Sequence, residues 1–145
     1  MSEDVTAKEN DEIIKGLCRA LADEGFGYSL SDEGYIYVPT GLEFPMWIDF
    51  YAELSAIRIF SYARILADSF AEVDVLELVN RMNMHFVPNQ VYYLDGCVYC
   101  CHTILVSGGI SDHLFVSTLR HCAGAFVIAA QECDHANLFS RGAAH

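Results

Sequence analysis

Cysteine and histidine, which bind metal ions and carry redox chemistry, gather in one short segment of the chain. The segment reads Cys97-Val98-Tyr99-Cys100-Cys101-His102. Its spacing nearly matches the signature of covalent haem attachment, but one extra residue separates the second cysteine from the histidine, so the match fails. A thiol- or metal-dependent sensor is the function that this segment predicts, and its working residues would be Cys97, Cys100, Cys101 and His102.

The local structure expected around these cysteines argues against a shared metal ion. Asp95-Gly96, directly before Cys97, is a strong signal for a two-residue hairpin turn, so the cysteines follow on the returning strand. Successive side chains of a strand point to opposite faces, and Cys97 and Cys100 therefore diverge. Cys97 and Cys101 share a face but lie roughly 13 Å apart at the rise of a strand. We expect small buried cysteines, with no bound metal and no cofactor.

Three other groups contain residue types that could catalyse a reaction, bind phosphate or bind a metal ion, but their spacing does not fit these roles. Ser111-Asp112-His113 has the residue types of a catalytic triad, but chain neighbours do not face one another. Gly108-Gly109 precedes a helix start, where phosphate groups bind, but no lysine follows. Cys133-Asp134-His135 would need His121 or Cys122, which diverge on a helix. We therefore expect no catalytic residues and predict that the chain is not an enzyme.

Asn80 and Asn83 lie near the end of a predicted helix. Residues three apart share one side of a helix, so both amides point the same way. They can hold a neighbouring backbone in place, or they can grip an extended peptide or a partner strand. Most side-chain hydrogen bonds go to the backbone, which favours the structural role. Both residues are nevertheless candidates for partner binding.

Aromatic residues are plentiful, with eight Tyr, nine Phe and one Trp. On a half-covered sheet they pack across strands, whereas an exposed group of them would form a recognition surface. Both alternatives are open at the level of the sequence. The aromatic residues on predicted strands are Tyr35, Tyr37, Trp47, Tyr51, Tyr92 and Tyr99, and of these Trp47, Tyr92 and Tyr99 are candidate binding residues.

The elements that must position these residues follow from hydrophobic periodicity. A period of two indicates an antiparallel sheet covered on one side, and helical spacing indicates three helices. The expected helices cover residues 10–24, about 70–86 (after a Ser69/Glu72 capping box and before Pro88), and about 112–133 behind a Ser111 cap. The expected strands cover 28–30, 35–38, 46–51 and 57–60, and then a hairpin in which Tyr92 faces Tyr99 and whose second strand runs to about Val106.

The last expected helix is apolar on nearly all sides. Phe115, Leu119 and Phe126 belong to its main stripe, and further apolar residues lie off that stripe. A sheet covers only one side of such a helix, so we expect the second cover to be another copy of the chain. The predicted homodimer interface contains Val116, Ala123, Val127 and Ile128.

Composition limits the partners. The chain has 145 residues, 53% of them apolar, and a formal net charge of −12. A surface this acidic repels phosphate backbones and anionic lipid, so we expect neither nucleic acid nor a membrane as partner. No targeting segment is visible, and the longest helical apolar run, Cys122 to Ala130, is too short to span a bilayer. We therefore expect a cytoplasmic protein with reduced cysteines.

The order of signals between Leu76 and Ser111 resembles a known family. A helix ending in Asn80 and Asn83, the Asp95-Gly96 hairpin and the Ser107-Gly108-Gly109 turn into a helix are similar to the YbjN-domain family of small bacterial proteins. That family is described as sensory-transduction regulators and shares its fold with the chaperones of type III secretion. The resemblance implies a single α+β domain over residues 1–145, and the composition of the two ends predicts flexible tails at 1–9 and 139–145. The resemblance also implies an antiparallel sheet with flanking helices in the order α-β-β-β-α-β-β-α.

The resemblance further implies a regulator or adaptor and supplies no catalytic residues. We expect a bacterial protein that binds an unidentified protein partner through its sheet or its dimer surface. One alternative is a chaperone, similar to those of type III secretion, that holds a client segment. The thiol- or metal-dependent sensor is the alternative from another class.

Overall fold

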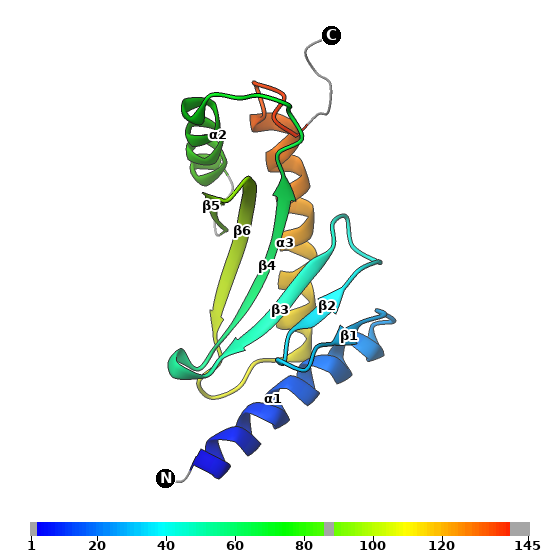
Figure 1. Cartoon of the computed structure of the whole chain (residues 1–145). Coiled ribbons are helices and arrows are strands. Elements are labelled where there is room, and N and C mark those ends of the chain that lie inside the picture. Colours follow the sequence, from blue (N-terminus) through cyan, green and yellow to red (C-terminus); the bar gives the residue numbers. More distant parts are fainter. Residues whose placement is uncertain (1–2, 86–88, 140–145) are drawn as a thin grey trace.

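The computed structural model describes residues 3–85 and 89–139 as an α+β fold (Figure 1). Four strands precede the second helix, as hydrophobic periodicity predicted; the order implied by the resemblance has one fewer, and the additional strand is the two-residue strand at Ser29, which pairs with the next one. The elements are α1 (Glu3–Asp23), β1 (Ser29–Leu30), β2 (Ile36–Val38), β3 (Met46–Tyr51), a 3-10 turn (Ala52–Leu54), β4 (Ala56–Arg64), α2 (Glu72–His85), β5 (Gln90–Leu94), β6 (Cys97–Leu105) and α3 (Asp112–Cys133).

All six strands join one antiparallel sheet in the order β1-β2-β3-β4-β6-β5. The centre of the sheet is the pairing of β4 with β6, which extends from Ala56 opposite Leu105 to Arg64 opposite Cys97. The β5–β6 hairpin has the predicted register, since Tyr92 lies opposite Tyr99 and Leu94 opposite Cys97. Asp95 and Gly96 form its turn with φ angles of 50° and 81°. This positive-φ pair is the geometry that Asp-Gly favours.

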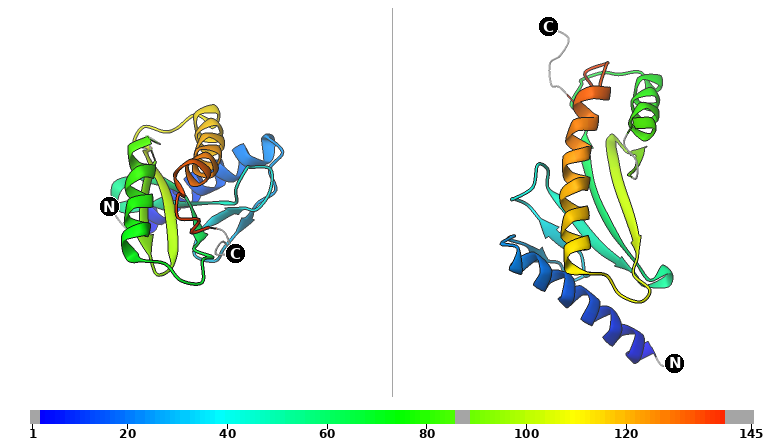
Figure 2. Two further views of the ribbon diagram at one scale, coloured as in Figure 1. Left: turned by 90° about the horizontal axis from the view of Figure 1, so that it is seen from above. Right: turned by 180° about the vertical axis from the view of Figure 1, so that it is seen from behind.

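The helices bury one face of the sheet. Leu21 of α1 and Leu119 of α3 pack with Ile48 of the sheet in one apolar cluster. Met82 of α2 packs in a second cluster with Val98 of β6. Figures 1 and 2 show α3 running along this face. Within the described residues, no helix packs on the opposite face, which is called the open face below.

The helix boundaries differ slightly from those expected. α1 begins at Glu3 rather than near residue 10, and α2 begins at Glu72 rather than near residue 70. The predicted end of α2, at Phe86 and Pro88, lies outside the described residues. Phe139, placed in the expected C-terminal tail, packs against the second apolar cluster.

α3 is covered on more sides than the sequence indicated. Val116 and Ala123, expected at a homodimer interface, are buried within the chain, at 5% and 0% exposure. That expectation was wrong for these two residues because α1 and α2, besides the sheet, pack against α3. Ile128 is 48% exposed and Val127 is half-buried. By length and composition α3 is also able to cross a membrane, although the core helix of a soluble fold has the same features.

The turn into α3 has the geometry that its residues favour. Gly108 and Gly109 both have positive φ angles, 87° and 96°, which L side chains rarely adopt. The Ser111 hydroxyl then accepts a hydrogen bond from the Leu114 backbone N–H at 3.1 Å. These glycines and this serine therefore shape and cap the helix start.

Candidate functional site

Aromatic side chains from five neighbouring strands form a continuous row across the open face. Tyr37 of β2 stacks on Trp47 of β3 with ring centroids 4.5 Å apart. Trp47 stacks on Tyr62 of β4 at 5.2 Å, and Tyr62 contacts Tyr99 of β6 at 5.4 Å. Tyr99 stacks on Tyr92 of β5 at 5.1 Å. These five residues are called the aromatic row.

Strand register produces the row. Tyr37 lies directly opposite Trp47, and Tyr99 lies opposite both Tyr62 and Tyr92. Cross-strand aromatic pairs stabilise a sheet, so part of the role of these rings is structural. Tyr62 and Tyr92 remain 40% and 37% exposed because nothing in the described chain covers the row. The rings thus pack across strands and two of them are also exposed, whereas a role in recognition stays a prediction.

A shallow hollow of about 650 Å³ lies over part of the row. Its floor is aromatic, and Tyr35 meets the ring of Phe60 edge-on at 6.2 Å between centroids. The hollow, called the aromatic hollow below, is lined by Ser31, Asp32, Glu33, Tyr35, Trp47, Phe60, Tyr62 and Tyr99.

The turn that borders the hollow is held by its first residue. The Ser31 hydroxyl accepts a hydrogen bond from the Tyr35 backbone N–H at 3.0 Å. The Ser31 backbone N–H donates to the Tyr35 carbonyl at 2.9 Å, and the Gly34 N–H donates to the Ser31 carbonyl at 3.0 Å. Asp32 and Glu33 therefore project from an ordered turn next to the aromatic floor.

One ion pair lies on the open face beside Phe60. The Arg58 guanidinium donates two hydrogen bonds to the Asp49 carboxylate, at 2.7 and 3.2 Å. These hydrogen bonds raise the pKa of Arg58. The guanidinium carbon also lies 5.0 Å from the centre of the Phe60 ring. The open face thus already holds one arginine over an aromatic ring.

Three of the binding residues predicted from the sequence lie in the aromatic row. Trp47, Tyr92 and Tyr99 belong to the row, where the structure brings them together through Tyr62. Sequence analysis missed Tyr62 because it ended that strand at Phe60. The alternation of Arg58, Phe60 and Tyr62 continues past that point and was the available signal.

Asn83 and Asn80 have different surroundings. The Asn83 side chain donates to the Val91 carbonyl at 2.9 Å and accepts from the Val91 N–H at 2.8 Å. It therefore holds a neighbouring backbone, as the structural interpretation expected. Asn80 makes only a weak 3.8 Å contact with the sulfur of Met84 and is exposed. Partner binding by either amide stays a prediction.

The four residues of the possible sensor do not converge. Cys97 and Cys101 lie on the open face with Tyr99 between them, whereas Cys100 and His102 lie on the face that the helices cover. All six cysteines are free, and no group of three His, Cys, Asp or Glu residues in the described parts of the chain is arranged to hold a metal ion.

The buried thiols are also poor nucleophiles. Burial raises the pKa of Cys100 and that of Cys122 to about 12, and it raises the pKa of Cys101 as well. Because the thiolate is the reactive form, thiols with such pKa values react slowly at neutral pH. The structure thus gives no support to a sensor built on this segment.

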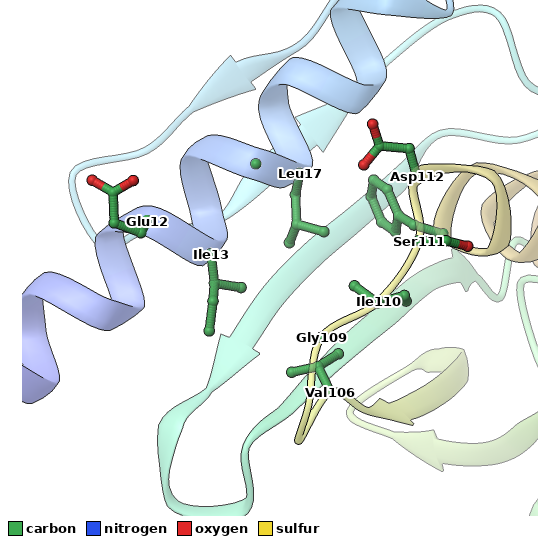
Figure 3. A pocket seen from close by; sticks show the side chains of 10 residues that line it. Glu12, Ile13, Leu17, Val106, Gly109, Ile110, Ser111 and Asp112 are labelled. Atoms are coloured by element: carbon green, nitrogen blue, oxygen red, sulfur yellow. The ribbon is translucent and has the colours of Figure 1, made fainter.

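A second cavity, of about 320 Å³, lies between α1 and the start of α3. Figure 3 shows Ile13 and Leu17 of α1 on one side of it and Val106 and Ile110 on the other. Its lining is mostly apolar, and Ser111, the one hydroxyl residue there, is engaged in capping α3. Glu12 and Asp112 supply two carboxylates to the lining, which contains no histidine, cysteine or basic residue.

Comparisons of the sequence with known proteins give one family match. The family model described as "YbjN: Putative bacterial sensory transduction regulator" matches residues 14–135. A comparison with the sequences of curated proteins found no match.

Two solved structures share the fold. One is "Crystal structure of YbjN, a putative transcription regulator from E. coli", with a TM-score of 0.68 and 16% identity over 88% of this chain and 95% of that one. The other is "Crystal Structure of the ExsC-ExsE Complex", with a TM-score of 0.67 and 15% identity over 88% of this chain and 97% of that one. These likenesses confirm the expected α+β, type III secretion chaperone-like fold and carry no activity with them.

Proposed function

The chain belongs to the YbjN family, and from this premise we propose that it is a cytoplasmic, non-enzymatic adaptor that binds a protein partner on the open face of its sheet. The observation that carries the proposal is the aromatic row. It is continuous over five strands, and two of its rings are more than one third exposed. Tyr and Trp are enriched in the cores of protein interfaces, where they bury large areas with few rotatable bonds.

The edges of the sheet favour binding by the face rather than by strand addition. At the β5 edge, Asn83 occupies the N–H and the carbonyl of Val91. At the other edge, β1 has only two residues, Ser29 and Leu30. An added strand needs a longer run of free backbone groups than either edge offers.

A capture experiment with matched variants tests the proposal. The full-length chain, the double variant Tyr62→Thr/Tyr92→Thr, and Tyr28→Thr are each used as bait in lysate of the source cell. Tyr28 is as exposed as Tyr62, at 40%, but lies outside the aromatic row. Threonine keeps a high strand propensity. A partner that binds the wild type and Tyr28→Thr but not the double variant supports the proposal, and a partner retained by all three contradicts it.

The chaperone alternative makes a narrower claim about the same surface. One structural neighbour was solved as a complex of two proteins, which supports partner binding by this fold class in general. If the protein captured through the aromatic row is itself a secreted one, the chaperone function replaces the adaptor function.

We propose homodimer formation only through the part of α3 that is not fully buried, at half-buried Val127 and exposed Ile128. A solution mass of a single chain at micromolar concentration would rule the homodimer out. Metal analysis with thiol counting on fresh protein tests the sensor alternative, which predicts bound zinc or missing free thiols.

A further inference from the structure

We propose that the aromatic hollow binds the side chain of an arginine in an extended, basic segment of the partner. The arginine stem would lie against the rings of the floor, and its guanidinium would pair with Asp32 and Glu33. This inference rests on the proposed function, since it names the chemistry of the partner that the open face takes.

The charged residues that line the hollow are all acidic. Asp32 and Glu33 are its charged lining residues, both negative. Neither has an ion-pair partner among residues 3–85 and 89–139. Arg58, the nearby cation, is already neutralised by Asp49. A positive group from outside is therefore the missing complement, and the net charge of −12 attracts basic segments from a distance.

The carboxylates are held where a bound side chain can reach them. Three hydrogen bonds between Ser31 and residues Gly34 and Tyr35 order the turn, and Tyr35 also contacts Phe60 of β4. An ordered turn loses less conformational entropy on binding than a free one. The aromatic floor removes water from one side of the bound group, which strengthens its pairing with the carboxylates.

The residues that line the hollow suit arginine better than lysine. A guanidinium is planar, is more weakly hydrated than an ammonium, stacks on rings and pairs with a carboxylate through two hydrogen bonds. The molecule already uses this combination once on the same face, where Arg58 lies 5.0 Å from the centre of Phe60 while it pairs with Asp49. The hollow places Tyr35 and Trp47 beside the carboxylates of Asp32 and Glu33, and no arginine is among its lining residues.

The sole tryptophan makes the test direct, because Trp47 lines the hollow and reports on it by fluorescence. The full chain is titrated with a short peptide of alternating arginine and alanine, and with the same peptide carrying uncharged citrulline in place of arginine. Calorimetry on the same samples detects any binding that leaves the emission unchanged. We expect the arginine peptide to bind at least about tenfold more tightly than the citrulline peptide, with a lysine peptide between them.

Two double variants distinguish binding at the aromatic hollow from general attraction of a basic peptide to an acidic protein. Asp32→Asn/Glu33→Gln should weaken binding of the arginine peptide by about tenfold. Glu9→Gln/Asp11→Asn changes the net charge equally at exposed positions of α1 and should leave the affinity within about twofold. Equal binding of the citrulline peptide, or equal losses in the two double variants, would overturn the inference. The proposed function is tested separately, since partner capture through Tyr62 and Tyr92 can succeed while the arginine preference fails.

Discussion

The Asn83 side chain occupies both backbone hydrogen-bonding groups of Val91. The amide nitrogen donates to the Val91 carbonyl at 2.9 Å, and the amide oxygen accepts from the Val91 N–H at 2.8 Å. Val91 belongs to β5, the last strand of the sheet, so a side chain from α2 here takes the place of a neighbouring strand. This contact fixes α2 to the sheet edge and blocks that edge at one position.

Removal of this amide should destabilise the fold. Asn83→Ala removes the partner of the N–H and of the carbonyl of Val91, a residue that is only 3% exposed. We expect a loss of about 1–3 kcal/mol in the free energy of unfolding, measured by urea denaturation. Asn80→Ala is the control, because Asn80 is exposed and its contact with Met84 is weak, and its effect should stay within about 0.5 kcal/mol. Equal effects of the two substitutions would refute the structural role of Asn83.

The cap of α3 gives a second prediction. Ser111→Ala removes the hydrogen bond from the Leu114 N–H to the serine hydroxyl and should cost about 1 kcal/mol of stability. Ser117→Ala is the matched control, since Ser117 is exposed within the same helix and bonds only back to the Leu114 carbonyl. Alanine favours helices, so this control should be neutral or slightly stabilising in thermal denaturation. A control as destabilising as Ser111→Ala would speak against the cap.

Two glycines should respond to alanine with opposite signs. Gly96 has a φ of 81° in the β5–β6 turn, where an L residue is strained, so Gly96→Ala should destabilise by about 1–2 kcal/mol. Gly16 lies in the middle of α1, and a Cβ added there meets nothing within 4 Å. Gly16→Ala should stabilise by about 0.5–1 kcal/mol. Chemical denaturation of both variants checks the signs, and a shared sign would be inconsistent with this geometry.

The buried thiols make stability depend on alkaline pH. Burial raises the pKa of Cys100 and Cys122 from the ordinary 9.0 to about 12, so the folded chain keeps these protons longer than the unfolded chain does. Their contribution is complete below pH 9 and declines as pH rises from there toward 12. The decline is at most about 1.4 kcal/mol per pH unit for each thiol.

Variants isolate this contribution from that of other titrating groups. Unfolding free energies are measured between neutral and alkaline pH for the wild type, Cys100→Ala/Cys122→Ala and Cys97→Ala. The double variant should have a shallower dependence on pH than the wild type, whatever its absolute stability. Cys97 is the only cysteine that is not buried, so Cys97→Ala is the control for removal of a thiol as such, and the slope of the double variant is compared with its slope. Identical slopes for all three proteins would count against burial of the two thiols.

Local structure could be predicted from the sequence wherever the residues of a short segment determine its backbone conformation. Asp95-Gly96 favours a positive-φ turn, and that turn alone sets Tyr92 opposite Tyr99. Ser111 caps α3 through a bond to a residue three positions away. Strand alternation likewise predicted that Cys97 and Cys100 point to opposite faces of the sheet, as they do in β6.

Tertiary structure decided which surfaces are covered, because coverage depends on elements far apart in the chain. Val116 and Ala123 looked available to a second copy until α1 and α2 were seen to pack against α3. The aromatic residues alternate along their strands in the sequence, but only the placement of all the helices on one face leaves the row from Tyr37 to Tyr92 open. The sequence by itself thus determined turns, caps and strand register through local backbone preferences, whereas packing between distant segments determined which side chains a partner can reach.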